Sequence, residues 1–389
     1  MEVKIFGKPT CTVTTSNNQN SYAWDSWGSL LKLITGKVVE YSYVRHWDKV
    51  GDFTLKFPMD ETILNAVELG GFISVDNADW LMIEDISYDS SSITLKGPDA
   101  KGLLNLRVSL YRDPQEPGTQ GYDVIAGTTK ECVKHFLDAN CIDPENTERA
   151  LPIVFSTDSA AGLTDDHYMA RLESLADIVN KLCVDAELGY SMTGRIPDIY
   201  GNKFSFRLRK GVDRTINQSN NAYVIFGSDR EKVVELSFAH SVSTLLNYVY
   251  AEDSNKAVDE VSRYGNPAVY IESYIDRREC TVSVGISTSQ ETGEYFDSYV
   301  LNEIADNIET HSCEVETAYS EDFGSRYDLG DKVSILDRFT GNVFDMVITS
   351  AEKSYSCGQS SLKLTFGRPK DKPLDRIVNS FISGTARRQ

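Results

Sequence analysis

Neighbouring acidic residues are the feature of this sequence that could most readily do chemistry. They occur at Asp60-Glu61, Glu84-Asp85, Asp165-Asp166 and Glu321-Asp322. Two carboxyl groups on either side of a glycosidic bond can supply the acid and the base or nucleophile of glycoside hydrolysis. The chain has 58 Asp and Glu residues, however, so such neighbours arise by chance. Because spacing alone does not give the geometry that catalysis requires, we predict no catalytic residue among them.

Three short motifs have competing interpretations as ligand sites. Asp165-Asp166-His167 could lie at the edge of a metal cluster, but acids at a helix start would accept hydrogen bonds from free backbone N–H groups instead. Residues 76–79 (DNAD) lack the glycine and the bidentate glutamate of a calcium loop, which favours a hairpin turn between Ile73 and Trp80. Residues 7–10 (GKPT) lack the upstream glycine of a phosphate loop. We therefore predict no metal and no cofactor.

The cysteines and histidines form no recognisable site either. No two of the seven cysteines make a CxxC pair, and none of the five histidines stands at HExxH spacing. The sequence also contains no GxSxG motif, which would mark a nucleophilic serine. This pattern predicts a chain made in a reducing cytosol, without disulfides or a zinc site, that is not an enzyme.

Aromatic residues gather near the N-terminus and suggest a binding surface. Tyrosine and tryptophan suit a sugar-binding face, but they are equally common where one protein subunit contacts another. The segment 10–29 is otherwise polar, so we predict an exposed loop that a partner orders. The residues concerned are Tyr22, Trp24, Trp27, Trp47 and Trp80.

The elements that would position these residues are mainly strands. Several short segments alternate apolar and polar residues with a period of two, which is typical of strands with one buried face. Glycine and aspartate before or after them favour turns. We predict antiparallel barrels or sandwiches at both ends of the chain. The segments are residues 53–57, 93–95, 204–208, 282–286 and 362–366.

Helical patterns cluster in the middle of the chain. Apolar residues at three- and four-residue spacing predict a helix within residues 163–188, capped by Asp165 or Asp166 and ended by Gly189. A second helix is predicted over residues 128–140, with Thr128 or Thr129 as its cap. A third is predicted over residues 98–106, where Pro98 stands at an early helical position.

Length and composition indicate a soluble protein of several domains. The chain has 389 residues, 41% of them hydrophobic, which predicts two to four domains. No apolar run reaches the ~20 residues of a membrane helix, and residues 1–10 do not resemble a signal peptide. Loops are predicted at residues 112–121, 193–201 and 217–221, and a tail after residue 370.

The chain is strongly acidic. It carries 39 Lys and Arg against 58 Asp and Glu, which gives a formal net charge of -19. General nucleic-acid binders need a basic footprint that releases counterions from phosphates. The charge therefore excludes that class, although it suits a surface that nucleic acid passes without adhering.

The order of the motifs resembles a known family. The chain is similar to the tail-associated hub proteins of long-tailed phages and prophages, the central baseplate hubs, over about residues 38–367. Each motif alone is a generic strand or turn, but their order and spacing together are characteristic. The motifs are GDFTLKFP (51–58), LMIEDISYDSSSITLKGPDAKGLLNLRV (81–108), FSFRLRKGVDRT (204–215), VIFGSD (224–229), LNYVYAED (246–253), Arg278-Glu279, YDLGDKVSI (327–335) and LKLTFG (362–367).

The resemblance implies a structural protein of the virion tail tip, assembled in the cytoplasm of a host bacterium. The implied fold is α+β and β-rich, with two antiparallel β-barrel domains and inserted mixed α/β domains. Three copies would form a pseudo-hexameric ring that closes the tail tube. The implied partners are the chain itself as a homotrimer, the distal tail protein ring, the tape measure protein, and a spike or fibre protein. DNA would pass through the lumen without specific binding, and the chain would not insert into a membrane.

The resemblance also assigns structural roles to particular residues. Four glycines would stand where the backbone turns tightly, namely Gly51, Gly97, Gly330 and Gly367. The charged residues of the motifs would form ion pairs, either buried or at subunit contacts; they are Arg107, Asp213, Arg214, Arg278, Glu279 and Asp331.

The expected domain limits follow from the motifs and loops. Residues 1–115 would form the N-terminal barrel domain, and residues 116–200 an inserted domain with helices. Residues 201–320 would complete the first barrel and add an inserted α/β domain. Residues 321–370 would belong to the second barrel, and residues 371–389 would form a tail.

Two alternatives remain open from the sequence. A carbohydrate-binding or glycoside-cleaving β-protein would act on host cell-surface glycan, and it would need a cleft with two carboxylates and exposed aromatic residues. A spike hub of a contractile injection machine would share the sequence pattern of a phage hub. The gene neighbourhood, rather than the sequence, would separate that last case.

Overall fold

The structure is a computed structural model of the whole chain. No helix among the described residues is long and apolar enough to span a bilayer. The described residues are 1–16, 19–24, 30–76, 78–110, 121–164, 166–194, 203–227, 233–253, 255–262, 274–283, 296, 300, 304, 307, 310–318, 322–337, 341–356 and 358–367. The predicted loop at 112–120, most of the loop at 193–201 and the tail after residue 370 lie outside them.

Two sheets enclose the N-terminal core. A four-stranded sheet has the order β4-β1-β7-β8, and its inner face contributes Val3, Ile5 and Ile73, which are fully buried. Phe53, Leu55 and Phe57 enter the same core from β6, as their alternation predicted. The short helix α1 (Glu61–Leu64) covers one end. The strands of the small sheet are β1 (Glu2–Phe6), β4 (Leu30–Thr35), β7 (Phe72–Val75) and β8 (Asp79–Met82).

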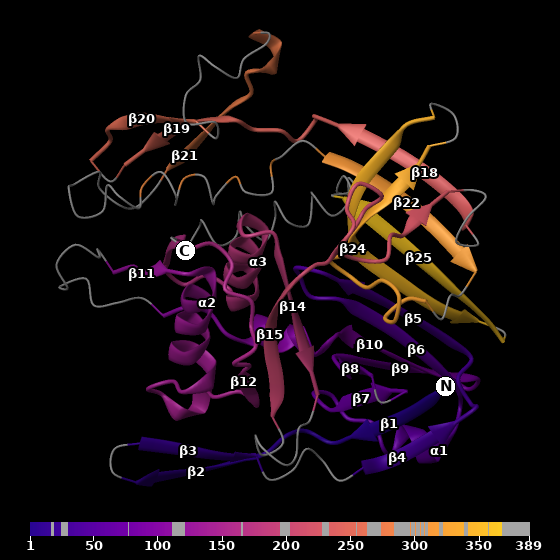
Figure 1. The fold of residues 1–389 in the computed structure, drawn as a ribbon. Helices are drawn as coiled ribbons and strands as arrows, with labels where there is room; N and C mark the ends of the chain where they lie inside the picture. The colour runs from indigo at the N-terminus through magenta and orange to yellow at the C-terminus, as the bar shows by residue number, and fades with distance from the viewer. Residues whose placement is uncertain are drawn as a thin grey trace.

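The second sheet joins the two ends of the chain. Its order is β18-β22-β25-β24-β5-β6-β10-β9, so the N-terminal and C-terminal strands meet where β5 pairs with β24 (Figure 1). The pairing is antiparallel and runs from Ser350↔His46 to Ser356↔Glu40. Its strands are β5 (Glu40–His46), β6 (Asp52–Pro58), β9 (Asp85–Tyr88), β10 (Ser92–Pro98), β18 (Val233–Ser241), β22 (Thr310–Ala318), β24 (Val343–Ser356) and β25 (Gln359–Gly367).

A C-terminal core packs beneath the other half of this sheet. Phe226, Tyr327 and Phe366 are buried there, with the Phe226 ring centroid 5.2 Å from that of Tyr327. The strand β23 (Lys332–Leu336) pairs antiparallel with β24 and parallel with two short strands, β16 (Asp213–Arg214) and β17 (Ile225–Phe226). The chain is therefore β-rich, as predicted, while strand pairing among the described residues closes no barrel.

The middle of the chain forms a third core from helices and a small sheet. The helix α2 (Thr129–Leu137) begins with a capping box, in which Thr128 and Glu131 satisfy each other's backbone N–H groups. It continues as a π turn, η2 (Asp138–Ile142). Helix α3 (Leu175–Asp185) packs beside it (Figure 1), and the sheet has the order β12-β15-β14, with β12 (Ile153–Phe155), β14 (Leu188–Thr193) and β15 (Phe204–Lys210). The predicted helix at 128–140 and the strand at 204–208 are confirmed.

Smaller elements complete the described fold. A core around Val249 and Ala251 lies under the sheet β20-β19-β21. The remaining strands pair as β2 with β3 and β11 with β13, and residues 217–221 form the predicted turn. Their bounds are β2 (Cys11–Ser16), β3 (Gln19–Trp24), β11 (Asp123–Gly127), β13 (Asp166–Ala170), β19 (Tyr248–Glu252), β20 (Val258–Ser262) and β21 (Glu279–Ser283), with 3₁₀ turns η1 (Ala100–Leu106), η3 (Thr147–Arg149) and η4 (Tyr274–Asp276).

Three local predictions were wrong. The helix predicted within 163–188 begins only at Leu175, because residues 166–170 pair with β11 and Leu172 adopts a left-handed φ of 59°. Asp166 therefore lies in a strand and Gly189 in β14, while Asp165 lies outside the described residues. The segment 10–29 contains the hairpin β2-β3 rather than a loop. Residues 100–106 form a 3₁₀ turn capped by Asp99, with Pro98 still in β10.

Candidate functional site

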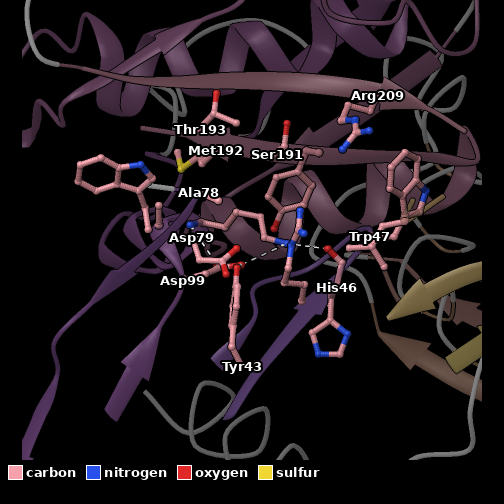
Figure 2. A pocket seen from close by; sticks show the side chains of 16 residues that line it. Tyr43, His46, Trp47, Ala78, Asp79, Asp99, Ser191, Met192, Thr193 and Arg209 are labelled. Carbon is pink, nitrogen blue, oxygen red and sulfur yellow. Dashed lines mark hydrogen bonds and ion pairs between the residues drawn. The ribbon is translucent and has the colours of Figure 1, made fainter. Parts of the chain in front are cut away.

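Side chains from several parts of the chain line a polar cavity where the cores meet (Figure 2). They come from β5, from the start of β8, from the start of η1, and from β14 and β15, together with Leu329. The cavity has a volume of about 70 Å³, which accommodates a few water molecules. Small-molecule sites occupy about 300–1,000 Å³, so this cavity is too small for a sugar or a nucleotide.

Lys101 is a deeply buried charge beside this cavity. Its Nζ donates a hydrogen bond to the backbone carbonyl of His46 at 2.8 Å and another to that of Lys49. Its Nζ also lies 5.0 Å from the centroid of the Tyr190 ring, in cation–π geometry. Burial lowers the pKa of Lys101, and the nearby carboxylate of Asp99 opposes that change. The hydrogen bonds of the ammonium group thus hold the turn after β5 against η1.

Asp99 is the partner of Lys101 and is equally buried. Its Oδ2 lies 3.6 Å from Lys101 Nζ and accepts a hydrogen bond from the Tyr43 hydroxyl at 3.3 Å, while Oδ1 accepts from the backbone N–H of Lys101 at 3.0 Å. Burial raises the pKa of Asp99, and burial also raises the pKa of Tyr43 well above its usual value. Because both oxygens of the carboxylate are engaged within the protein, Asp99 is built as a structural anchor.

A second buried acid connects the two ends of the chain. Asp79, in β8, accepts a hydrogen bond from the Tyr41 hydroxyl at 3.3 Å. The Nζ of Lys353, in β24, lies 3.8 Å from the same oxygen of Asp79. These contacts hold the four-stranded sheet against the seam at which β5 pairs with β24.

Two carboxylates at the start of β23 bind arginines from the middle of the chain. Arg214 Nε donates to Asp331 Oδ2 at 2.8 Å, so two predicted site residues meet in an ion pair. Asp331 also accepts hydrogen bonds from the backbone N–H groups of Val212 and Asp328. Arg209 lies 3.1 Å from Asp328 and also stacks over the ring of Trp47. The ion pairs therefore join residues more than 100 positions apart in the sequence.

The other predicted charged residues do not meet one another. Arg107 donates to the carbonyls of Arg149 and Leu106. The backbone N–H of Arg278 donates to Asn247 Oδ1, and the Arg278 carbonyl accepts from the backbone N–H of Asn247. Glu279 forms an ion pair with Arg277, two residues before it, rather than with Arg278. Asp213 accepts from the backbone N–H of Thr215 in a local turn.

Three of the four predicted glycines occupy crowded positions. A Cβ at Gly51 would lie 2.2 Å from the carbonyl oxygen of Val44, and one at Gly97 would lie 2.1 Å from that of Met82. Gly97 stands inside β10 rather than in a turn. Gly330 has a φ of +88°, and a Cβ there would strike the ring of Trp47. Gly367 ends β25 with a φ of 68°.

The groups that could do chemistry are scattered. Asp60 caps α1, and its hydrogen bonds with Thr62 hold its pKa below the usual value. Burial raises the pKa of the Cys141 and Cys313 thiols to about 12, so neither is an activated nucleophile. Within the described ranges, no three His, Cys, Asp or Glu residues could hold a metal ion.

The tryptophans do not form a sugar-binding face where the structure describes them. Trp24 and Trp47 are buried at 8% and 6% exposure. Trp80 packs between Phe6 and Phe204, with ring centroids at 5.3 and 5.8 Å. Trp27 lies outside the described residues. Together with the small cavity, these positions argue against the carbohydrate alternative.

Sequence reasoning missed the residues that line the cavity. Tyr43, Arg45 and Tyr190 lie outside the elements predicted from the sequence, whereas Asp99 and Lys101 lie in the helix predicted over residues 98–106. One local signal was available there: an aspartate at the start of that segment, which marks Asp99 as a cap. The polar spacing of Tyr41, Tyr43 and Arg45 on one strand was the other available signal.

Comparisons with known proteins give one family match. The model described as Siphovirus ReqiPepy6 Gp37-like protein matches residues 21–368. A search of curated proteins gave no match.

Three solved structures match this chain along most of its length. The 43 kDa tail protein of prophage MuSo2 from Shewanella oneidensis has a TM-score of 0.50 and 12% identity, and the match covers 95% of this chain and 98% of that chain. For prophage tail protein gp18 from Listeria monocytogenes EGD-e the TM-score is 0.49, with 12% identity and coverage of 97% and 98%. For the tail protein from Neisseria meningitidis MC58 it is 0.49, with 12% identity and coverage of 94% and 96%.

Proposed function

The chain belongs to the Siphovirus ReqiPepy6 Gp37-like family and is a phage tail-associated protein, and we propose that it is the hub at the tip of that tail. In this proposal three copies form a ring that closes the tail tube. The ring joins the distal tail protein ring to a spike or fibre protein and meets the end of the tape measure protein. The chain would act as a structural part of the virion, without catalysis, after assembly in the host cytoplasm.

The seam between β5 and β24 is the observation that carries the proposal. It makes one continuous sheet from the two ends of the chain, with a separate buried core against each half. Each half with its core would supply one barrel-like wall, so three copies would present six similar walls around an axis. The domain limits near residues 115, 200, 320 and 370 belong to this proposal and come from the motifs and loops of the sequence.

The polar groups at the junction support a structural role rather than a binding cleft. Both oxygens of Asp99 and the ammonium of Lys101 are engaged inside the protein. A buried charge pair with good partners costs much to break, because either residue alone would remain as an uncompensated buried charge. Such buried charge pairs would keep the cores in a fixed orientation when mechanical force acts on the tail tip.

Two free sheet edges support self-association. β4 ends the four-stranded sheet and exposes Leu30, Leu31 and Leu33, and β18 ends the long sheet and exposes Phe238. Exposed apolar edge strands readily pair with another chain. The net charge of -19 per chain would make the ring acidic, and DNA would pass through such a lumen without adhering.

The mass of the purified chain tests the hub proposal. Light scattering should give close to three times 43.5 kDa, and negative-stain images of that peak should show rings with a central channel. A mass of 43.5 kDa that persists after the distal tail protein is added would contradict a trimeric hub. A compact dimer without a channel would contradict it equally.

A further inference from the structure

An apolar patch lies on the surface of the middle region, away from the cavity and the seam. Four side chains form this leucine patch: Leu106, Val108, Leu110 and Leu172. Their exposed fractions are 48%, 39%, 42% and 58%. Together they make a small apolar patch, and an exposed apolar patch on a protein is often functional.

Two antiparallel segments of the chain form the patch. Residues 107–110 run antiparallel to residues 172–175, with Val108 opposite Ser174. Hydrogen bonds fix this register: Ser109 N–H donates to the Glu173 carbonyl at 2.7 Å, and Leu172 N–H donates to the Ser109 carbonyl at 3.1 Å. The alternation of an extended chain places Ser109 inside and its neighbours Val108 and Leu110 outside.

The backbone conformation of Leu172 is strained. Its φ of 59° is left-handed, a conformation that costs a non-glycine residue about 1–2 kcal/mol. Neither a glycine nor an asparagine stands there, although both would relieve the strain. The chain therefore keeps a strained leucine, and that leucine is the most exposed member of the leucine patch.

Arginines flank the leucine patch in a chain that is otherwise acidic. Arg107 and Arg149 direct their guanidinium groups to backbone carbonyls, and Arg149 Nη2 donates to the carbonyl of Val108 at 2.6 Å. Within the described residues neither arginine pairs with a carboxylate, and the buried Nε of Arg149 has no partner. Burial and the nearby charge of Arg149 lower the pKa of Arg107. Arg171, directly before Leu172, is exposed.

We propose that the leucine patch and its arginines form a docking site for an acidic, apolar peptide segment of another protein. The three arginines concentrate positive charge on a chain of net charge -19, so the complementary partner carries Asp and Glu beside its apolar residues. The patch is smaller than the ~800 Å² per partner of a stable subunit interface. It therefore fits one short segment rather than a second copy of this chain.

Site-directed photo-crosslinking in assembled tails tests this site. Benzoylphenylalanine at position 172, in tails purified with the full set of tail proteins, should crosslink to a peptide rich in Asp, Glu and apolar residues. Adding Arg171→Glu to the same chain should lower the yield at least threefold, because it replaces an attraction with a repulsion. The matched control carries the photo-probe at Leu69, which is 52% exposed in another part of the chain, and should not capture this peptide.

Other outcomes overturn the proposal. Capture of a second copy of this chain would show that the leucine patch is a self-contact, and capture of a basic peptide would refute the charge argument. The absence of any crosslink at position 172 in intact tails would show that the patch stays uncovered. None of these results affects the trimer mass, so the docking site and the hub can fail separately.

Discussion

At the scale of single residues, the junction shows how this acidic chain accommodates buried positive charge. Lys101 has backbone carbonyls as acceptors, which cannot titrate, as well as the carboxylate of Asp99. The positive charge of Lys101 also affects the pKa of the neighbouring imidazole of His46. Burial, followed by the charges of Lys49 and Lys101, lowers the pKa of His46 to about 3.

The folded protein should lose stability in acid through His46. Its imidazole stays neutral in the folded state down to about pH 3, whereas in the unfolded chain it takes up a proton near its usual pKa of 6.5. The unfolded state therefore binds more protons below pH 6.5, and the free energy of unfolding falls as the pH decreases. His46→Gln should remove up to about 1.4 kcal/mol of this loss per pH unit.

Urea unfolding at pH 7.5, 6.0 and 5.0 measures this effect. At pH 7.5 the imidazole is neutral in both states, so the difference between variant and wild type there reports packing alone. The two unfolding free energies should then converge, or cross, as the pH decreases. Parallel curves for the two proteins at all three pH values would show that His46 does not contribute.

At the scale of elements, one carboxylate holds a parallel pairing together. Asp331 receives the Arg214 guanidinium and two backbone N–H groups, and so fixes β16 against β23. Asp331→Ala should lower the free energy of unfolding by about 2–4 kcal/mol, because it leaves these donors without an acceptor. The midpoint of urea denaturation checks this value.

A surface ion pair provides the control for Asp331. Glu314 lies 2.8 Å from Lys363, and both side chains are more than 40% exposed. Glu314→Ala should cost less than about 1 kcal/mol, since solvent screens such pairs. Equal losses of unfolding free energy in the two variants would mean that the burial of Asp331 adds nothing to the stability.

The elements also show what the sequence could predict. Helix α2 was found because its signals are local: the spacing of its apolar residues and a threonine cap, Thr128, directly before it. The start of α3 was missed because residues 166–170 pair with β11, about 40 positions away, and such a partner leaves no local signal. The strands β6 and β10 were predicted because a strand with one buried face alternates apolar and polar residues.

The candidate site could be predicted only in part for the same reason. Arg214 and Asp331 were both selected from the sequence, but their contact spans 117 positions and was not foreseen as a pair. Arg278-Glu279 was selected as a unit, and the structure gives Glu279 a different arginine. Local patterns thus identify charged residues in motifs, whereas their partners depend on the topology.

At the scale of the whole molecule, the chain folds back so that its two ends share a sheet. This closure uses the edges of β5 and β24, and in the two large sheets it leaves β4, β8, β9 and β18 as edges among the described strands. Leu81 of β8 forms a bridge to Asp99. The edge at β9 carries Asp85 and a following Asp89, and charges of this kind discourage pairing. The edge at β4 has three exposed leucines and no acidic residue. The whole-molecule arrangement therefore favours β4 as a contact between copies.

A charge at the β4 edge should separate the copies of the proposed ring. Leu33 is 49% exposed, and Leu33→Lys would place an ammonium group where a neighbouring copy would bury the leucine. Burying an unpaired charge is unfavourable, so light scattering should show the mass falling from three times 43.5 kDa to 43.5 kDa with unchanged circular dichroism. Leu69→Lys, at a leucine that is 52% exposed outside the strands, should leave the larger mass unchanged. A Leu33→Lys variant that retains the full mass would exclude β4 from the contact and point to the remaining apolar edge at β18.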